Sequence, residues 1–363
     1  MMDSVFIENE EITALGIMSG TSLDGLDLAL CKFVKESNKW NFSIISAITY
    51  EYKESWKEKL TQAPHLNGFN LIELHRNYGF YIGKKINLFL KQQNLKPDLI
   101  ASHGHTVFHE PENRFNFQLG DGAAIAAETG ITTVSDFRSL DICLGGQGAP
   151  LVPIGDHHLF SEYGYCINFG GIANISMLNR NNERIAYDIC PVNFILNWLS
   201  GYLGGSFDKD GEWGRSGKIN PQLLNQLNNL GFYSLNPPKS IGREWIEKNV
   251  IEIINKSRIS VYDKMRTFYE HIAMQVADNI KDGKNNKAII TGGGALNKFL
   301  IELLQDKSDK EIIIPNRQLI DYKEALIFAF LGVLRMSNTS NCLKSVTGAI
   351  QDNCGGQVFF VNS

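Results

Sequence analysis

The chain begins with three apolar segments that are separated by short polar turns. Runs rich in Ile, Leu, Val and Phe that turn residues bound are typical of strands, and they occur at residues 12–18, 26–34 and 42–52. Their close succession favours an antiparallel meander. Apolar residues at helical spacing predict a helix over 71–91. Shorter segments follow, with strands expected at 98–102 and 131–134 and a helix at 121–128.

The same order of elements starts again after residue 160. Three further strands are expected, and the turn Gly170–Gly171 joins the first two. The predicted elements are strands at 165–169, 173–178, 185–189, 288–290 and 311–314, and helices around 260–281, from Leu296 and from Asp321. Such an internal repeat predicts two similar lobes with the active site in the cleft between them.

We therefore expect an α/β fold of two similar ribonuclease-H-like lobes, each with a mixed five-stranded-type sheet flanked by helices. The Gly- and Pro-rich stretch 145–153 is the expected boundary, so the predicted domains are 1–150 and 151–363. The apolar run 325–334 is too short to span a bilayer and predicts a buried helix. It leaves open whether the last helix crosses back to the first lobe.

Composition narrows the class of protein. The 363 residues suffice for two domains, and 43% of them are hydrophobic, which supports sizeable cores. With 35 basic and 39 acidic residues and no basic run, no nucleic-acid partner is expected. The N-terminus lacks the pattern of a secretory signal, and the six cysteines form no Cys-x-x-Cys pair. We expect a cytoplasmic protein with free thiols and no membrane partner.

The turn between the first two strands has the residue types of a phosphate-binding loop. Glycines let backbone N–H groups approach an anion closely, and the hydroxyls of Thr21 and Ser22 add donors. Asp24 and Asp27 are candidate metal ligands, directly or through water. An ordinary glycine-rich turn is the alternative interpretation.

Further glycine turns and one carboxylate extend this pattern along most of the chain. The motifs are Gly16–Asp27, Ser102–Val107, Leu119–Asp121, Thr129–Thr132, Asp136–Arg138, Gly145–Pro153, Asn168–Asn174, Asp208–Asp210, Pro237–Glu244, Thr291–Asn297, Asp321, Glu324–Ala325 and Val346–Ala349. With these motifs in this order, the chain resembles the anhydro-N-acetylmuramic acid kinases of the actin/hexokinase/Hsp70-like superfamily.

The resemblance implies a reaction and its cofactors. The family phosphorylates 1,6-anhydro-N-acetylmuramic acid with ATP while water opens the anhydro ring, which recycles peptidoglycan as N-acetylmuramic acid 6-phosphate. It implies ATP and Mg²⁺, a small sugar substrate and a homodimer. The implied ATP contacts are Gly20, Thr21, Ser22, Leu23, Asp24, Gly25, Leu26, Asp27, Asn168, Gly170, Gly171, Asn174, Gly292, Gly293 and Gly294.

Asp188 is the candidate catalytic residue. A water that attacks the anomeric carbon needs a general base, and a carboxylate within hydrogen-bond reach suits that role. Asp188 matches the family's catalytic aspartate, but the usual Asp-Thr-Gly-Pro-Gly-Asn reads Asp-Ile-Cys-Pro-Val-Asn here. If the lost glycines need positive φ, Cys190 and Val192 are strained, and Pro191 suits the first turn of a helix. A carboxylate without a catalytic role is the alternative.

The sugar contacts implied by the resemblance lie in the first lobe, at Ser19, His103, His105, Asp136 and Arg138. The His-x-His spacing also fits a zinc site, but a loop that reaches the sugar is favoured. Asp136 and Arg138 suit either substrate contacts or an ion pair, and the guanidinium suits the lactyl carboxylate. The family usually has Gln at position 105. For Glu324, a structural role and a role in the site both stay open.

Two other functions compete with this one. The altered segment 188–193 and His105 are compatible with a kinase of the same fold that acts on a different small sugar. A catalytically impaired nucleotide-binding sensor, or an actin-like assembly protein, is the alternative outside enzymes.

Overall fold

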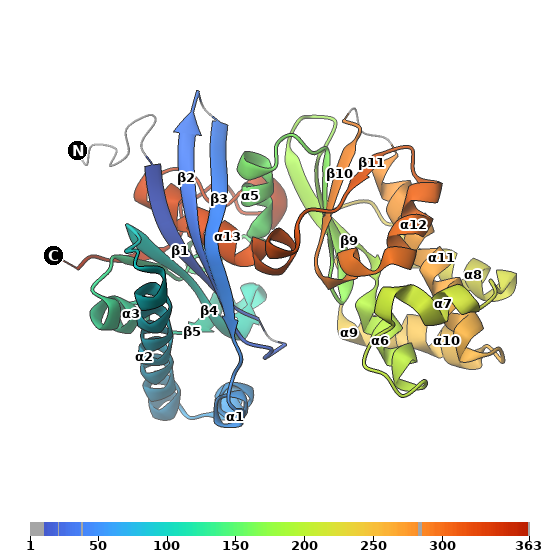
Figure 1. Ribbon diagram of the computed structural model, residues 1–363, viewed down its shortest axis with the longest axis horizontal. Coiled ribbons are helices and arrows are strands. Elements are labelled where there is room, and N and C mark those ends of the chain that lie inside the picture. The colour runs from blue at the N-terminus through green and yellow to red at the C-terminus, as the bar shows by residue number, and fades with distance from the viewer. Residues whose placement is uncertain (1–10, 21, 38, 282–284, 362–363) are drawn as a thin grey trace. The chain divides into compact units, whose positions relative to one another are not determined.

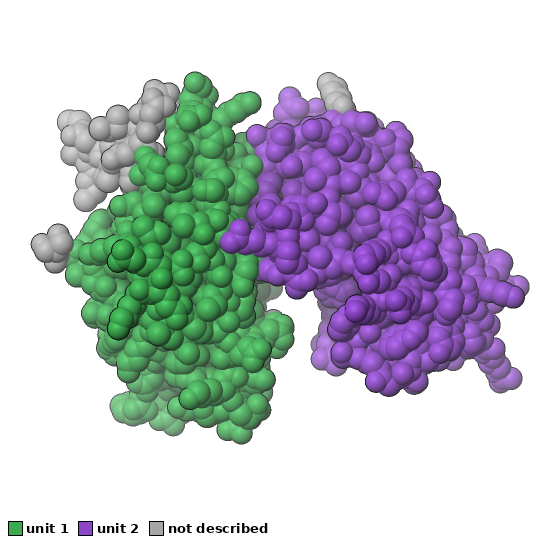
Figure 2. Space-filling view, in the orientation of Figure 1, with its two compact units in different colours: residues 1–159, 322–363 green, residues 160–321 purple. Residues whose placement is uncertain are grey.

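The computed structural model describes residues 11–20, 22–37, 39–281 and 285–361 (Figure 1). The chain forms two compact units, residues 1–159 with 322–363 (unit 1) and residues 160–321 (unit 2), as Figure 2 shows. Each unit has a mixed sheet flanked by helices, so the predicted fold class is confirmed. The units differ in their bounds from the predicted domains 1–150 and 151–363, because residues 151–159 and 322–363 pack within unit 1.

The sheet of unit 1 contains the predicted meander. β1, β2 and β3 pair antiparallel in turn, whereas β4 runs parallel to β1, and β6 runs parallel to β4. The order is β12-β6-β4-β1-β2-β3, with β5 paired to β4. The strands are β1 (Glu11–Ser19), β2 (Leu26–Glu36), β3 (Lys39–Tyr50), β4 (Leu99–Glu110), β5 (Phe115–Leu119), β6 (Thr133–Ser135) and β12 (Gln357–Phe359).

The period of two along β1 explains how this sheet is covered. Leu15 and Ile17 pack into one core with side chains of α2, because alternate residues of a strand share a face. Gly16, between them, lies against the backbone of α13 at Ala325. The helices of unit 1 are α1 (Glu54–Gln62), η1 (Ala63–His65), α2 (Gly68–Gln93), η2 (Pro111–Asn113), α3 (Gly122–Thr129), α4 (Ser139–Cys143), α5 (Val152–Leu159), α13 (Arg317–Met336, from residue 322 on) and α14 (Lys344–Thr347).

Unit 2 repeats the topology of unit 1. Its strand order, β11-β10-β7-β8-β9, corresponds to β6-β4-β1-β2-β3, with the same parallel and antiparallel pairs. The predicted internal repeat is therefore confirmed. The strands are β7 (Tyr165–Phe169), β8 (Ile172–Leu178), β9 (Arg184–Pro191), β10 (Lys287–Thr291) and β11 (Glu311–Ile313).

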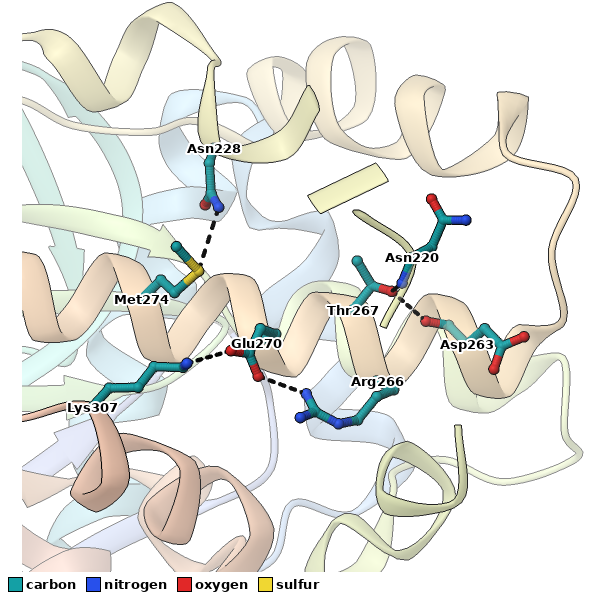
Figure 3. Close-up of polar contacts among 8 residues, drawn as sticks. All are labelled: Asn220, Asn228, Asp263, Arg266, Thr267, Glu270, Met274 and Lys307. Atoms are coloured by element: carbon teal, nitrogen blue, oxygen red, sulfur yellow. Dashed lines mark hydrogen bonds and ion pairs between the residues drawn. The ribbon is translucent and has the colours of Figure 1, made fainter. Parts of the chain in front are cut away.

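The helix α11 (Val261–Ile280) organises the helical layer of unit 2. It packs on β9, and polar contacts tie it to its neighbours (Figure 3). Thr267 Oγ1 accepts the N–H of Asn220 at 2.9 Å, while Glu270 on α11 pairs with Arg266 and with Lys307 of α12. The other helices are α6 (Asn193–Gly201), η3 (Lys209–Gly211), α7 (Glu212–Ser216), α8 (Pro221–Asn228), η4 (Gly231–Ser234), α9 (Arg243–Trp245), η5 (Ile246–Ile251, a π-helix), α10 (Glu252–Lys256), η6 (Gly293–Leu296) and α12 (Lys298–Lys307).

The apolar run at 325–334 is a buried segment of α13, as predicted, and its residues from Ala325 to Phe330 are at most 2% exposed. Among the described helices, none has the length and apolar character needed to cross a membrane. All six cysteines are free, and four of them are buried.

Candidate active site

The β1–β2 turn of unit 1 carries the first predicted phosphate contacts. Leu23 adopts a positive φ of 59°, and its N–H donates to the carbonyl of Gly20 at 3.3 Å. Gly25 is needed for packing, since a Cβ there would lie 2.6 Å from Cγ2 of Thr49. Leu26 is buried at the start of β2. Thr21 lies outside the described residues. A cavity of about 640 Å³ opens beside the turn and is lined by Ser22, Leu23, Asp24, Glu51, Glu54, Lys57 and Thr61.

Asp27 has a different environment from Asp24. Its Oδ1 accepts the Thr49 hydroxyl at 2.6 Å, whereas Asp24 is exposed at the turn. Glu324 of α13 keeps solvent contact, yet the surrounding protein raises the pKa of its carboxyl, and the charge of Asp27 raises that pKa further. Asp27 and Glu324 thus interact electrostatically, and carboxylate oxygens are ligands that Mg²⁺ takes in sites where it keeps several waters.

Ser19 and His105 lie in a buried hydroxyl cluster. Ser19 Oγ accepts from the hydroxyls of Tyr52 at 2.8 Å and Tyr78 at 3.0 Å. It lies 3.1 Å from Nδ1 of His105 and can donate its own proton there. Burial lowers the pKa of His105 to about 4, so the ring is neutral. The sugar contacts predicted for both residues stay predictions, and Ser19 is only 1% exposed.

We expect His105→Gln to weaken the dependence of stability on pH. Between pH 6.5 and about 4, the unfolded chain binds a proton at His105 that the folded chain does not. The wild-type free energy of unfolding therefore falls as the pH falls, with up to about 1.4 kcal/mol per pH unit from this histidine. Urea unfolding at several pH values measures the slope. An unchanged slope in the variant contradicts a neutral buried His105.

His103 lies in a strand rather than in the predicted loop. β4 continues through residue 110, and Gly104, with φ of 74°, forms an irregularity in its pairing with β1. His103 Nε2 accepts from Nη2 of Arg138 at 2.7 Å, which places the ring proton on Nδ1, beside the carbonyl of Gly104. Arg138 Nη1 donates to the carbonyl of Gly148 at 2.6 Å.

Asp136 is held by its own turn. It adopts a positive φ of 55°, and its Oδ1 accepts the hydroxyl of Ser139 at 2.6 Å. Its Oδ2 accepts from the amide of Gln357 on β12 at 3.2 Å. These contacts give Asp136 a structural role, and its predicted sugar contact stays a prediction. Burial lowers the pKa of Arg138 to about 10, with the lactyl carboxylate as its predicted partner.

In unit 2 the structure brings the two remaining glycine turns together. Gly292 has a φ of 79°, and a Cβ there would lie 2.6 Å from Oδ1 of Asn168 and 2.8 Å from the carbonyl of Phe169. Asn193, at the start of α6, donates its amide to the same carbonyl at 3.1 Å. The backbones of the two turns can approach this closely only because Gly292 has no side chain. Residues 171 and 293 stay exposed, and Gly170 and Gly294 complete the turns.

A polar row crosses the sheet of unit 2 beside these turns. Asn168 on β7 pairs with Asn174 on β8, and Asn174 pairs with Asp188 on β9. Directly paired residues of neighbouring strands have side chains on the same face. The predicted nucleotide contacts and the candidate base therefore share one face of this sheet.

Asp188 has well-defined hydrogen-bond partners. Its Oδ2 accepts from Ser240 Oγ at 3.0 Å and from the N–H of Ile241 at 2.8 Å. Burial raises the pKa of the carboxyl, and these two hydrogen bonds oppose the rise. A raised pKa suits a group that must take a proton from water during catalysis.

The altered segment after Asp188 is not strained. Cys190 lies within β9, and Val192 has a φ of −127°, so the strain expected from the lost glycines does not arise. The helical position expected for Pro191 is also wrong, because Pro191 ends β9 and α6 begins at Asn193. The strand continues farther than predicted since the N–H of Val192 donates to the carbonyl of Gly171 at 2.8 Å.

Among the residues that the structure describes, no group of three or more His, Cys, Asp and Glu side chains could hold a metal ion. The zinc interpretation of His103 and His105 thus gains no support. A ring nitrogen of His103 is hydrogen-bonded to Arg138, and a ring nitrogen of His105 is hydrogen-bonded to Ser19. Sequence reasoning gave no role to Asn193, Ser240 or Thr49. The motif Pro237–Glu244 was the one signal that could have drawn attention to Ser240.

Comparison with known proteins identifies the family. The family model described as anhydro-N-acetylmuramic acid kinase matches residues 12–361. The chain belongs to this family. It is 36% identical to the anhydro-N-acetylmuramic acid kinase of Mannheimia succiniciproducens, 34% to that of Sulfurimonas denitrificans and 35% to that of Haemophilus influenzae. Each alignment covers 95% of this chain and 98%, 98% and 97% of these relatives. The predicted family and enzyme class, a kinase, are confirmed.

Proposed function

We propose that the chain phosphorylates 1,6-anhydro-N-acetylmuramic acid with ATP and opens its anhydro bridge with water, for the recycling of peptidoglycan in the cytoplasm. The water oxygen bonds to the anomeric carbon, and the bond from that carbon to O6 breaks. O6 takes the γ-phosphoryl group, ADP leaves, and the product is N-acetylmuramic acid 6-phosphate. Asp188, with its raised pKa and fixed orientation, supports this assignment best.

The chain's own residues have separate tasks in this proposal. Asp188 accepts the proton of the attacking water. The turns at Gly20–Asp27, Asn168–Asn174 and Gly292–Gly294 hold the nucleotide, because their glycines let backbone N–H groups approach phosphates. Mg²⁺, when bound, would neutralise phosphate charge, with Asp27 as its ligand directly or through water and Asp24 or Glu324 beside it. The predicted cleft between the lobes and the homodimer stay predictions.

Isotope labelling tests the coupled reaction. The protein is mixed with ATP, Mg²⁺ and the anhydro-sugar in ¹⁸O-labelled water, and the mass of the product is measured by mass spectrometry. We expect one added phosphoryl group and one ¹⁸O on the sugar in the same molecule. A phosphorylated sugar without the label contradicts coupled ring opening, and ADP release without a sugar product contradicts the kinase assignment.

A second candidate is a kinase that acts on a different small sugar. It is favoured by the positions at which the chain departs from the pattern that the resemblance implies, namely Ile189, Cys190, Val192 and His105. A panel of anhydro-sugars and simple sugars, each assayed for sugar-dependent ADP release, separates the two functions. The highest kcat/KM identifies the substrate.

A further inference from the structure

We propose that Ser240 is a positioning residue that fixes Oδ2 of Asp188 and thereby leaves Oδ1 as the atom that takes the proton from water. The inference rests on the proposed role of Asp188 as general base. It adds a residue and an atom to that role, since the comparisons identify a family and assign no contact to Ser240.

Three hydrogen bonds clamp Asp188 to one short segment. Ser240 Oγ and the N–H of Ile241 donate to Oδ2 at 3.0 and 2.8 Å. The backbone N–H of Asp188 donates to the carbonyl of Lys239 at 3.0 Å. Backbone and carboxylate of one residue are thus tied to three consecutive residues, which restricts rotation of the carboxylate about χ1 and χ2.

The segment is itself held in place on both sides of Ser240. Lys239 Nζ donates to the carbonyl of Phe232 at 3.3 Å, and its ammonium lies 4.7 Å from the ring centroid of Phe232. Ile241 is 5% exposed and belongs to the core of unit 2. Ser240, between these two anchors, is exposed. Removing its hydroxyl therefore leaves the core contacts unchanged.

The two carboxylate oxygens consequently differ in chemistry. Oδ2 accepts two donors, which satisfy its lone pairs and disfavour a proton on it. A base must hold its reacting oxygen in a defined direction, because small misplacements cost much of the rate. Among the described residues, the buried thiol of Cys190 interacts electrostatically with the Asp188 carboxylate, and Lys239 and Tyr233 interact in turn with that thiol.

The test variant is Ser240→Ala. Ser240→Thr is the conservative variant, and Ser234→Ala is the matched control. We expect Ser240→Ala to lower kcat by about tenfold to a hundredfold with an unchanged KM for ATP. Losing a donor to the ionised carboxylate raises the pKa of Asp188, so the acidic limb of the rate profile moves to higher pH. Ser240→Thr keeps a hydroxyl and restores both values. Ser234→Ala, at an exposed serine of η4, matches wild type.

Two results overturn the inference. One is an unchanged kcat and acidic limb in Ser240→Ala. The other is a lower melting temperature with an unmoved limb, which indicates a structural role only. If the wild type fails to turn over the anhydro-sugar, the proposed function fails by itself. The hydrogen bond is then tested by a ¹³C NMR titration of the Asp188 carboxyl. The signal is assigned with the Asp188→Asn variant, and the midpoint of the titration must rise in Ser240→Ala.

Discussion

Replacing Asp188 with asparagine is expected to lower turnover of the anhydro-sugar by about a thousandfold, within the range that a general base contributes. The amide keeps the size of the carboxyl, so the contacts of β9 with its neighbours remain. It cannot accept the proton of the attacking water. Ring opening and phosphoryl transfer should therefore stop together, since O6 becomes available only as the anhydro bond breaks.

ATP binding separates a chemical defect from a folding defect in this variant. We expect calorimetry to give the wild-type affinity for ATP and Mg²⁺, because the glycine turns are unchanged. Asp309→Asn is the matched control, since this carboxyl in unit 2 is 77% exposed, and it should retain full turnover. Near-normal turnover by Asp188→Asn contradicts the assignment of Asp188 as the base.

Replacing Gly16 with alanine is expected to destabilise unit 1 by more than about 3 kcal/mol, at the upper end of overpacking effects. A Cβ at this position would overlap the carbonyl oxygen of Ala325 and lie 2.8 Å from the backbone N of Ala329. Both are main-chain atoms of the buried helix α13, which cannot move aside as a flexible side chain would. The strand and the helix must separate to make room.

Urea unfolding measures this effect, with Gly68→Ala as the control. Gly68 begins α2, and nothing lies within 4 Å of a Cβ built there. The control gains helix propensity and should match or slightly exceed the wild-type stability. If Gly16→Ala shows the stability of the control, β1 and α13 do not approach each other as closely as described.

The predicted elements agree best with the structure where apolar periodicity is strong. The meander at β1–β3 and the long helices α2 and α11 follow directly from such patterns. Strand β12 and the pairing of β5 with β4 were not predicted, because a short edge strand is defined by its partner and not by its own sequence.

The site shows the same division. Glycine turns and Asp188 are recognisable because each needs a particular residue type, and the structure groups those of unit 2 on one sheet. The partners of these residues are less visible. Ser240 is 52 positions away from Asp188, and no local pattern links two residues at that separation. His103 and His105 were expected in a loop, but they lie in β4. The strand continues past Gly104 through a backbone irregularity, and residue types alone do not predict such an irregularity.

Unit 1 is built from two stretches of chain separated by the whole of unit 2. Residues 322–363 supply α13 to the face of β1 and strand β12 to the edge at β6. During synthesis the stretch up to residue 159 therefore emerges before α13, the helix that packs against β1. Ribosomes add about 5 to 20 residues per second, so the apolar face of the sheet at β1 lacks α13 for many seconds. An exposed apolar face of this kind is what chaperones protect, and unit 2, which is a single continuous stretch of chain, can finish folding before unit 1.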